Sequence, residues 1–442
     1  MEKKLSAITG RDIDFAKWYT DVVVKSGLAA YSNVKGCIYI PPFGTAVWDL
    51  FKSEFDKLLK DLGYQNVMFP LLMPKSLLQK EKDHITGFSP EVAMIAGNDA
   101  DPLLVRPTSE ALFCDYFANN LQSYKQLPLR LNQWANIVRM EKTTRPFLRT
   151  TEFFWQEGHS IFATEEEARS EAKKIHKLYE DFCRDVLAVP VISGQKTDSE
   201  KFAGAIDTYT IESMMWDGQA LQSATSHYLG DGFMRAFDVL VQGRDGLEFH
   251  PHYVTFGLST RLIGGIVMVH GDDNGLVLPP RVAPVQVVVV PIRNADVSSI
   301  KILNTRIHVD NSDNSPGWKF SEWEMKGVPI RLEIGPRDIE AGECVVSIRH
   351  SGEKRKIKLS KLGVAIPKLL DEIHNAMFVK AKQRLDTSQS FVTAPWCGAE
   401  SCETEHKKKT GMGSRCIIDV SKGKCVACGK SAKHNVVWAR AY

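Results

Sequence analysis

The 442-residue sequence lacks several features that would each fix a broad class of protein. It has no unbroken apolar run near the roughly 18 residues that a membrane-spanning helix needs. Its start, MEKKLSAITGRDIDFAKWY, contains no apolar stretch of the kind that forms a signal peptide. We therefore expect a cytoplasmic protein without a membrane partner.

A strong charge of one sign is also absent, because the net charge is only +3. Any nucleic acid would therefore be bound by local basic patches and not by a field of the whole molecule. Neither GxGxxG nor GxxxxGK[ST] occurs, so a nucleotide would not be held at a parallel sheet in the usual manner. With 43% hydrophobic residues, the chain has enough apolar material for two or three domains.

Cysteine is scattered singly before position 345 and paired only near the end of the chain. Cys397 and Cys402 form one close pair, and Cys425 and Cys428 form a second pair in CVACGK. Two such pairs can meet in one tetrahedral thiolate site, so we expect a structural Zn²⁺ there and no catalysis. The alternative is unpaired thiols in a loose tail. Cys416 is left over and is expected to pack as a small hydrophobic residue.

Hydrophobic spacing predicts the main elements. Residues 45–62 carry apolar side chains at helical intervals up to Gly63, and residues 164–187 form a second amphipathic helix that opens on Thr164. Residues 65–74 are expected to form one short strand that Pro74 ends. VQVVVVPI is a continuous apolar run, typical of a strand buried on both faces, and RIHVD, IRLEIG and CVVSIRH predict further strands.

Two composition changes divide the chain. The double proline at 279–280 and the polar stretch RLDTSQS near 385 are typical of domain boundaries. We expect an α/β multi-domain protein with domains at 1–282, 283–385 and 386–442.

The segment RPFLRTTEFFWQEGH (145–159) combines charges with aromatic rings. At the period of two that a strand imposes, one face carries Arg149, Thr151, Phe153, Trp155, Glu157 and His159. A cation can bind a polyphosphate and a ring can stack on a purine, so this face predicts a nucleotide or similar ligand. Arg139 and Glu141 are expected on the same side of a preceding strand, which gives a hairpin. The alternative is a polar sheet face covered by another domain.

Three further segments mix polar and apolar groups. VRPTSEAL places Thr108 and Glu110 before a helix, where a plain capping box is an equally good interpretation. LQSATSHYLG places Gln222, Thr225 and His227 close together, although a single histidine is often structural. GLSTRLIGG places Arg261 at the start of a helix of small residues, which lets the backbone approach a ligand.

These segments resemble those of one family. GCIYIPPFG, RPTSEA, RMEKTTRPFLRTTEFFWQEGH, QSATSHYLG, GLSTRLIGG, PGWKFSEWEMKGVPIRLEIGPRD, CVACGK and the terminal ARAY are similar to class II prolyl-tRNA synthetases, of the type shared by archaea, eukaryotes and some bacteria. The resemblance implies a class II synthetase antiparallel sheet with flanking helices, an α/β anticodon-binding domain and a small α+β C-terminal domain that contains zinc. It also implies a homodimer formed through residues 44–74, which include Pro70.

The resemblance implies an activity and a role for each residue. The protein would activate L-proline with ATP and Mg²⁺ and transfer the prolyl group to tRNA-Pro. Arg139 and Arg261 would be catalytic. The residues that would contact ATP are Arg139, Glu141, Arg149, Thr150, Phe153, Gln222, Thr225, Ser259 and Arg261. Those that would contact proline are Thr108, Glu110, Arg139, Trp155, His159 and His227. Glu152 and Glu157 receive no role.

The resemblance also assigns RNA-binding residues. Glu324, Arg331, Arg337 and Asp338 match the positions that read the anticodon, and arginine and carboxylate groups suit guanine. A salt-bridged sheet face is the alternative for any one of them. Only 63 positions separate His159 from Gln222, which leaves no space for an editing domain. We therefore expect no editing of mischarged alanyl-tRNA by this chain.

The chain departs from the family pattern after VVVVPI. Only 13 residues, RNADVSSIKILNT, separate Ile292 from Arg306, where the family has a long helix. A parallel crossover normally needs a dozen residues or more, usually with a helix, so the anticodon domain is expected to lack its first helix. The family's Ser-Trp before GLSTRLIGG is here Thr255-Phe256. A paralogue that no longer charges tRNA, and an adenylating enzyme with another carrier, remain alternatives.

Overall fold

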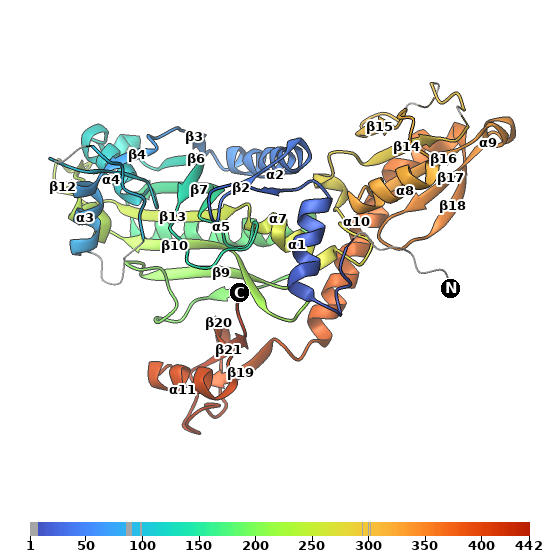
Figure 1. Cartoon of the computed structure of the whole chain (residues 1–442). Helices are drawn as coiled ribbons and strands as arrows, with labels where there is room; N and C mark the ends of the chain where they lie inside the picture. The colour runs from blue at the N-terminus through green and yellow to red at the C-terminus, as the bar shows by residue number, and fades with distance from the viewer. Residues whose placement is uncertain (1–7, 85–90, 98–99, 294, 299, 301) are drawn as a thin grey trace.

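The computed structural model describes residues 8–84, 91–97, 100–293, 295–298, 300 and 302–442. The first residues of MEKKLSAITGRDIDFAKWY, on which part of the signal-peptide expectation rests, lie outside this range. Figure 1 shows a large body with a central sheet, a second body built on residues near 290–360, and a small C-terminal body beneath. Within the described residues, no helix has both the length and the apolar character to cross a bilayer.

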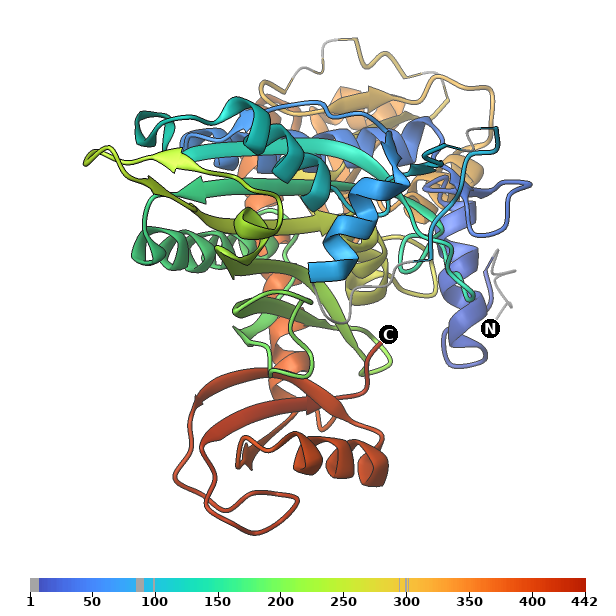
Figure 2. The same ribbon diagram turned by 90° about the vertical axis from the view of Figure 1, so that its left-hand side faces the viewer.

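One sheet of ten strands runs through the large and the C-terminal bodies. Its order is β19 (Val392–Trp396), β21 (His434–Ala439), β20 (Gly413–Val420), β8 (Val191–Gln195), β9 (Asp207–Met214), β10 (Ala220–Gly230), β13 (His252–Ser259), β7 (Glu152–Phe162), β6 (Leu129–Val138) and β3 (Gln65–Asn66). All neighbours are antiparallel except β3 and β6. Figure 2 shows the C-terminal strands continuing the sheet below β8 and β9.

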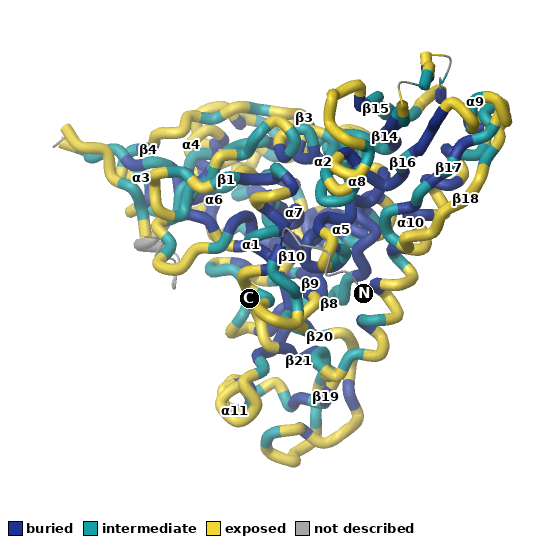
Figure 3. Tube along the Cα trace, turned by 45° about the vertical axis from the view of Figure 1, so that its right-hand side comes forward, coloured by how far each residue is buried: buried dark blue, intermediate teal, exposed yellow. Residues whose placement is uncertain are grey.

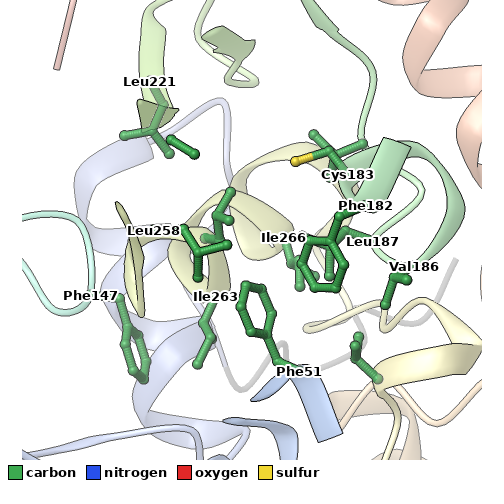
Figure 4. Close-up of a cluster of buried hydrophobic side chains, with 14 of the residues drawn as sticks. Phe51, Phe147, Phe182, Cys183, Val186, Leu187, Leu221, Leu258, Ile263 and Ile266 are labelled. Atoms are coloured by element: carbon green, nitrogen blue, oxygen red, sulfur yellow. The ribbon is translucent and has the colours of Figure 1, made fainter. Parts of the chain in front are cut away.

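Helices cover the sheet and build its main core. Those of the large body are α1 (Phe15–Lys25), α2 (Pro42–Asp61), α3 (Lys75–His84), α4 (Glu110–Asn120), α5 (Glu165–Asp185), α6 (Gly232–Ala236) and α7 (Arg261–His270). Figure 4 shows part of the core, where Phe51 of α2, Phe182 of α5 and Ile266 of α7 face one another. The predicted helices at 45–62 and 164–187 are confirmed, and Thr164 and Glu167 form the capping box of α5.

The prediction of a single strand over residues 65–74 is wrong. The segment divides into β3, which pairs with β6, and β4 (Leu72–Pro74), which pairs with β5 (Leu103–Val105). Pro70 lies between the two strands, and proline has no N–H to donate to a ladder. Two other short pairs are β1 (Ala30–Tyr31) with β2 (Ile38–Tyr39) and β11 (Val241–Gln242) with β12 (Glu248–Phe249).

The second body is a five-stranded sheet in the order β15 (Ile307–Val309), β14 (Val287–Pro291), β16 (Ile330–Ile334), β17 (Glu343–Ile348) and β18 (Lys354–Lys358). The interior strand β14 is parallel to both neighbours, and Val287 to Val290 are fully buried, as the apolar run predicts. α8 (Pro316–Met325) covers one face, α10 (Leu362–Thr387) covers the other, and α9 (Pro336–Ala341) precedes β17. Figure 3 shows the buried central strands between exposed helix surfaces.

The connection from β14 to β15 contains no helix among its described residues, which agrees with the expected short crossover. Residues 294, 299 and 301 of this connection lie outside the described part of the chain. Val297 is 8% exposed and Ile302 is 5% exposed, and both join the core on the α10 side of the sheet. An irregular segment therefore contributes apolar side chains on the side of the sheet that α10 covers.

The C-terminal body begins where α10 ends. α10 runs from the five-stranded sheet down to the C-terminal body in Figure 1. α11 (Glu400–Thr410) packs beside β20, and Trp396, Val436 and Trp438 form a small core with two of the cysteines. Cys416 is fully buried as expected, and it lies against Gly194 of β8, where the two bodies meet.

Candidate active site

A cavity of about 250 Å³ lies on one face of the ten-stranded sheet. The residues that the sequence predicted for the site and that line this cavity are Thr108, Glu110, Arg139, Phe153, Trp155, His159, Gln222, Thr225, His227, Ser259 and Arg261. These residues come from five separate segments, so the fold brings together groups that are up to 153 positions apart in the sequence. The observation favours a ligand site over a sheet face covered by another domain.

The strand register explains why these side chains meet. One row across the sheet contains Leu131, His159, Thr255, His227 and Thr208. The next row contains Gln133, Glu157, Gly257, Thr225 and Thr210. Opposed residues on neighbouring strands point to the same face, so each row offers a short polar line to the cavity. Gly257 has no side chain, so the middle of its row leaves space for a ligand above the sheet.

Two arginines carry positive charge to the cavity without a carboxylate within 4 Å in the described part of the chain. Arg139 donates through Nε to the carbonyl of Pro107 at 2.8 Å, and Arg261 donates through Nε to the carbonyl of Leu148 at 3.0 Å. Burial lowers the pKa of both groups, and mutual repulsion with Arg139 and Arg149 adds to the effect at Arg261. Burial outweighs the attraction of nearby carboxylates such as Glu110 and Glu141, so the site favours an anionic ligand.

Glu157 connects the proline-binding candidates beneath the cavity. It accepts hydrogen bonds from Ser109 at 2.7 Å and from Gln133, and it lies 3.1 Å from Nε2 of His159. Burial disfavours its charge, but these hydrogen bonds outweigh burial and lower its pKa. His159 also bonds Tyr253 and stacks on Phe113 at 3.6 Å. The network fixes the imidazole, which gives the unassigned Glu157 a supporting role.

His227 lies at the other side of the same row. Its Nδ1 lies 3.0 Å from the hydroxyl of Thr208, and its ring lies 4.6 Å from that of Phe202. Burial lowers the pKa of His227 to about 3, so the ring is neutral and presents a flat apolar surface near pH 7. Across the cavity, the hydroxyl of Thr108 donates to Glu110. Ser109 is the N-cap of α4 but makes no side-chain capping bond, which disfavours the capping-box interpretation.

Three predicted ATP ligands, Glu141, Arg149 and Thr150, do not line this cavity. β6 ends at Val138 and β7 begins at Glu152, so Arg139, Glu141 and Arg149 belong to the loop of the hairpin and not to its strands. Arg149 and Arg261 line a neighbouring cavity of about 230 Å³, and Arg149 lies 3.9 Å from Glu141. Thr150 is buried near the loop and lines neither cavity. Because Arg261 lines both cavities, it connects the two sites.

The sequence analysis missed several lining residues. Lys196, Glu200 and Phe202 come from the segment KTDSEKF after β8, and Ser223, Thr208 and Thr255 come from the strands. Thr208 lies opposite His227 on a neighbouring strand, and Thr255 lies opposite both His227 and His159. Opposed residues share a face of the sheet, so both threonines were predictable once the strand pairing was known. The segment after β8 mixes charge with an aromatic ring, as RTTEFFWQEGH does, and this was the available signal.

Lys196 belongs to a buried ionic cluster that reaches the C-terminal body. Its Nζ lies 2.8 Å from Glu212, whose other oxygen lies 3.5 Å from Nε of Arg415. Thr197 donates to Glu403 of α11 at 3.0 Å, and Arg415 lies 4.0 Å from Glu200. The segment that forms one wall of the cavity is therefore attached to β20 and α11.

The five-stranded sheet carries its own cavity of about 370 Å³ between α8 and β16. Glu324 and Arg331 line it, and the guanidinium of Arg331 lies 4.3 Å from the ring centre of Phe320. Arg331 also donates to Glu333 at 2.8 Å, so the alternative of a salt-bridged sheet face describes its present state. Arg337 and Asp338 lie in α9 and do not line this cavity.

The four predicted metal ligands lie together. The sulfur atoms of Cys397, Cys402, Cys425 and Cys428 are all within 4.8 Å of one another. Burial disfavours the Cys425 thiolate, but the backbone amides of Cys428 and Ala427 outweigh it and lower its pKa. Four converging thiolates fit a structural Zn²⁺.

Glu152, which received no role from the sequence, lies away from this site and accepts a hydrogen bond from Asn136 at 2.8 Å.

Family models match most of the chain. Residues 94–270 match the tRNA synthetase class II core domain (G, H, P, S and T), and residues 282–369 match an anticodon binding domain. Residues 378–442 match the C-terminal region of prolyl-tRNA synthetase. The three matches follow one another in the order of the three bodies.

Individual relatives match over their full length. The chain is 49% identical to a proline–tRNA ligase of Clostridium novyi (strain NT) over 474 aligned positions, which cover 100% of this chain and 99% of the relative. It is also 49% identical to proline–tRNA ligase 2 of Bacillus thuringiensis subsp. konkukian, with 100% of each covered. Because the alignments are longer than 442 residues, the relatives have residues that this chain lacks.

Solved structures match the same fold. Prolyl-tRNA synthetase from Cryptosporidium parvum, complexed with halofuginone and AMPPNP, is 39% identical with a TM-score of 0.92, covering 99% of this chain and 100% of that one. The same enzyme complexed with L-proline and AMP is 38% identical with a TM-score of 0.92, covering 100% and 98%. The chain belongs to the class II prolyl-tRNA synthetases, the ATP-dependent ligases that join proline to tRNA.

Proposed function

We propose that this chain activates L-proline with ATP in the 250 Å³ cavity and transfers the prolyl group to tRNA-Pro. The observation that carries the proposal is the convergence of two desolvated arginines, a carboxylate and flat apolar walls in one cavity. The C. parvum relative, which is complexed with L-proline and AMP, supports the same ligands here.

Proline is proposed to lie in the part of the cavity near Glu110. Its secondary ammonium group needs a carboxylate and a hydroxyl, which Glu110 and Thr108 offer side by side. Its ring needs flat walls, and Trp155, His159 and the neutral His227 supply them. Arg139 is within reach of the cavity and offers a cation to the carboxylate that reacts.

ATP is proposed to extend from Arg139 toward Arg261. Phe153 would stack on adenine, with Gln222, Thr225 and Ser259 beside it on the same face of the sheet. Arg149 would contact ATP through the neighbouring cavity that Arg261 shares, and Glu141 and Thr150 would contact it from the same hairpin loop. Mg²⁺ would accompany the phosphates as part of the substrate complex and would offset charge on their oxygens.

The reaction needs positioning and charge stabilisation and does not need a protein nucleophile. A carboxylate oxygen of proline attacks the α-phosphorus, and the bond from that phosphorus to the bridging oxygen breaks as pyrophosphate leaves. A terminal ribose hydroxyl of tRNA then attacks the carbonyl carbon, loses its proton, and AMP leaves. Arg139 and Arg261 are already desolvated, so their attraction to the charge that develops is strong.

The remaining proposals concern assembly and recognition. Glu324 and Arg331 would read the anticodon in the 370 Å³ cavity, with Arg337 and Asp338 contacting RNA from α9. The exposed Met68, Leu71 and Leu72 support a homodimer through residues 44–74. The cysteine cluster supports Zn²⁺, and a chelator is expected to expose the C-terminal body to protease.

The finer classification follows from the sequence organisation. We assign the chain to the type shared by archaea, eukaryotes and some bacteria, supported by the match of residues 378–442 to a prolyl-tRNA synthetase C-terminal region. The stretch between His159 and Gln222 consists of α5, β8, β9 and short links, which supports the absence of an editing domain. Nine free thiols support a reduced cytoplasmic setting.

Proline-dependent exchange of pyrophosphate into ATP tests the activation step. Wild-type protein is expected to catalyse exchange with L-proline, and Glu110→Gln is expected to raise the KM for proline by about tenfold or more, with less effect on the KM for ATP. Asp115→Asn on the exposed side of α4 is the matched control. Absence of exchange with L-proline would contradict the proposal. Charging of tRNA-Pro separately tests whether the short crossover still permits transfer.

A further inference from the structure

A third cavity, of about 340 Å³, lies between the large body, the five-stranded sheet and the end of α10, and it has no role in the proposed reaction. The end of α7, the β9–β10 turn with Trp216, the last three turns of α10 and His350 of the five-stranded sheet all line it. Arg11, from the segment before α1, completes the lining. The large body, the five-stranded sheet and α10 therefore contribute to one shared wall.

The lining carries more positive than negative charge. Arg11, Lys380 and Arg384 line the cavity, whereas Asp272 is its acidic residue. Asp272 is already used, because Arg349 donates to both of its oxygens at 2.7 and 2.6 Å. In the described part of the chain, neither Arg384 nor Lys380 has a carboxylate within 4 Å. Asp273 lies near Arg11 and accepts from its backbone N–H at 2.8 Å.

Both arginines pack against a single indole. The guanidinium carbon of Arg11 lies 3.5 Å from the ring centre of Trp216, and that of Arg384 lies 4.5 Å from it. Burial lowers the pKa of Arg384 to about 10, and the nearby charge of Arg11 adds to this effect. Two cations packed on one indole disfavour each other, and an anion that contacts both would reduce the repulsion.

The contacts of these arginines with the protein are incomplete. Arg11 donates to the carbonyl of Gly271 at 2.9 Å, and Arg384 donates to that of Val269 at 3.1 Å, so both cap the end of α7. The Nε atom of each is shielded from water and has no hydrogen-bond partner among the described residues. Helix capping therefore explains part of their placement. Asp272 and Asp273 offset part of the charge of Arg11, whereas burial and the charge of Arg11 both act on Arg384.

We propose that this cavity binds a phosphate group, held by Arg11, Lys380 and Arg384. The volume is large enough for a phosphate and a small attached group, and three cations from two bodies suit a dianion. A bound phosphate would join the segment before α1, the end of α7 and α10. It would thereby stiffen the connection between the catalytic sheet and the helix that leads to the C-terminal body.

Calorimetric titration of the full chain with inorganic phosphate tests the proposal, with L-proline and AMP present at saturation and ionic strength held at about 0.15 M. We expect one site with a dissociation constant of about 5 mM or tighter, weakened about tenfold in Lys380→Met. Lys368→Met is the matched control, because it removes the same charge from the exposed side of the same helix. Arg384→Lys keeps the charge but loses the planar group that packs on Trp216, so it is expected to weaken binding less than Arg384→Met does.

Two results would overturn the proposal: no saturable phosphate binding, or equal affinities in Lys380→Met and Lys368→Met. The comparison of these two variants does not depend on whether proline and AMP occupy the proposed active site. The source of the phosphate is distinguished by kinetics of charging. If tRNA supplies it, inorganic phosphate competes with tRNA-Pro and Lys380→Met raises the KM for tRNA, whereas a small phosphate ester leaves that KM unchanged.

Discussion

The two sheets of this protein treat their arginines in opposite ways. Beside the ten-stranded sheet, Arg139 of the hairpin loop and Arg261 of α7 are tethered by Nε to backbone carbonyls and have no carboxylate within 4 Å in the described residues. On the five-stranded sheet, Arg331 already donates to Glu333, which Lys354 also contacts at 3.0 Å. The first arrangement is poised for an anion, and the second must exchange an internal partner for RNA.

This difference predicts different costs of removing an arginine. A desolvated cation whose only strong partner is the ligand contributes its full interaction to the reaction. An arginine with an internal ion pair contributes only the difference between its interaction free energy with the ligand and that with its internal partner. The catalytic sheet should therefore show the larger effects, and on the activation step itself.

The largest effect is expected for Arg139→Met. Proline-dependent pyrophosphate exchange should fall by about 10²- to 10³-fold in kcat/KM, because a preorganised cation is lost where charge develops. Arg244→Met, in an exposed loop, is the control and should retain exchange. A loss of less than tenfold for Arg139→Met would remove the proposed difference between the two sheets.

A smaller and more selective effect is expected for Arg331→Met. Charging of tRNA-Pro should fall by about ten- to hundredfold in kcat/KM, consistent with loss of about 1–3 kcal/mol of base recognition, while exchange stays unchanged. Arg355→Met on the exposed β18 removes a charge that pairs with Glu353 and serves as the control. Equal loss of exchange and charging would show that Arg331 acts through folding and not through RNA.

The crossover from β14 to β15 gives a test of stability in the five-stranded sheet. Ile302 is 5% exposed and its neighbour Leu303 is 82% exposed, so the two positions form a matched pair. Ile302→Ala should lower the free energy of unfolding of this body by about 2 kcal/mol, whereas Leu303→Ala should change it little. Hydrogen exchange of the β14 and β16 amides would measure both. Similar values would mean that the irregular segment contributes nothing to the core.

The sequence predicted the strand part of the site well and the loop part poorly. Period two correctly grouped Phe153, Trp155, Glu157 and His159, because β7 is regular from Glu152 onward. The same rule placed Arg149 and Glu141 on strands, and there it failed. Both lie in the hairpin loop, where tertiary contacts such as the hydrogen bond from the Thr151 amide to the carbonyl of Gly36 set the chain direction. A local periodicity carries no information about such contacts.

Contacts distant in the sequence were equally hard to predict. The missing crossover helix followed from a count of residues, but its partial replacement by Val297 and Ile302 did not. The junction of β20 with β8 rests on a single register pair, Ile417 with Gln195. So short a pairing leaves no extended hydrophobic pattern in the sequence from which it could be predicted. That junction brings Arg415 to Glu212 and Lys196, which explains why Lys196 was missed.

The smallest expected effect is on the pH dependence of stability. It compares a buried histidine of the ten-stranded sheet with an exposed histidine of the five-stranded sheet. The pKa of His227 is lowered to about 3 by burial, below the unfolded value of about 6.5. The unfolded chain therefore binds this proton first, and stability is lost as pH falls from 6.5 toward 3. Between pH 6.5 and 5.5, His227 alone should reduce the free energy of unfolding by about 1 kcal/mol.

Urea unfolding of His227→Gln at pH 6.5 and 5.5 isolates this contribution from that of other buried histidines, such as His270, whose pKa burial also lowers to about 3. The variant should lose about 1 kcal/mol less than the wild type over that interval. His308→Gln removes an exposed histidine of β15 in the five-stranded sheet and is the control for the loss of an imidazole. If both variants behave alike, His227 is protonated in the folded protein and cannot serve as an apolar wall for proline.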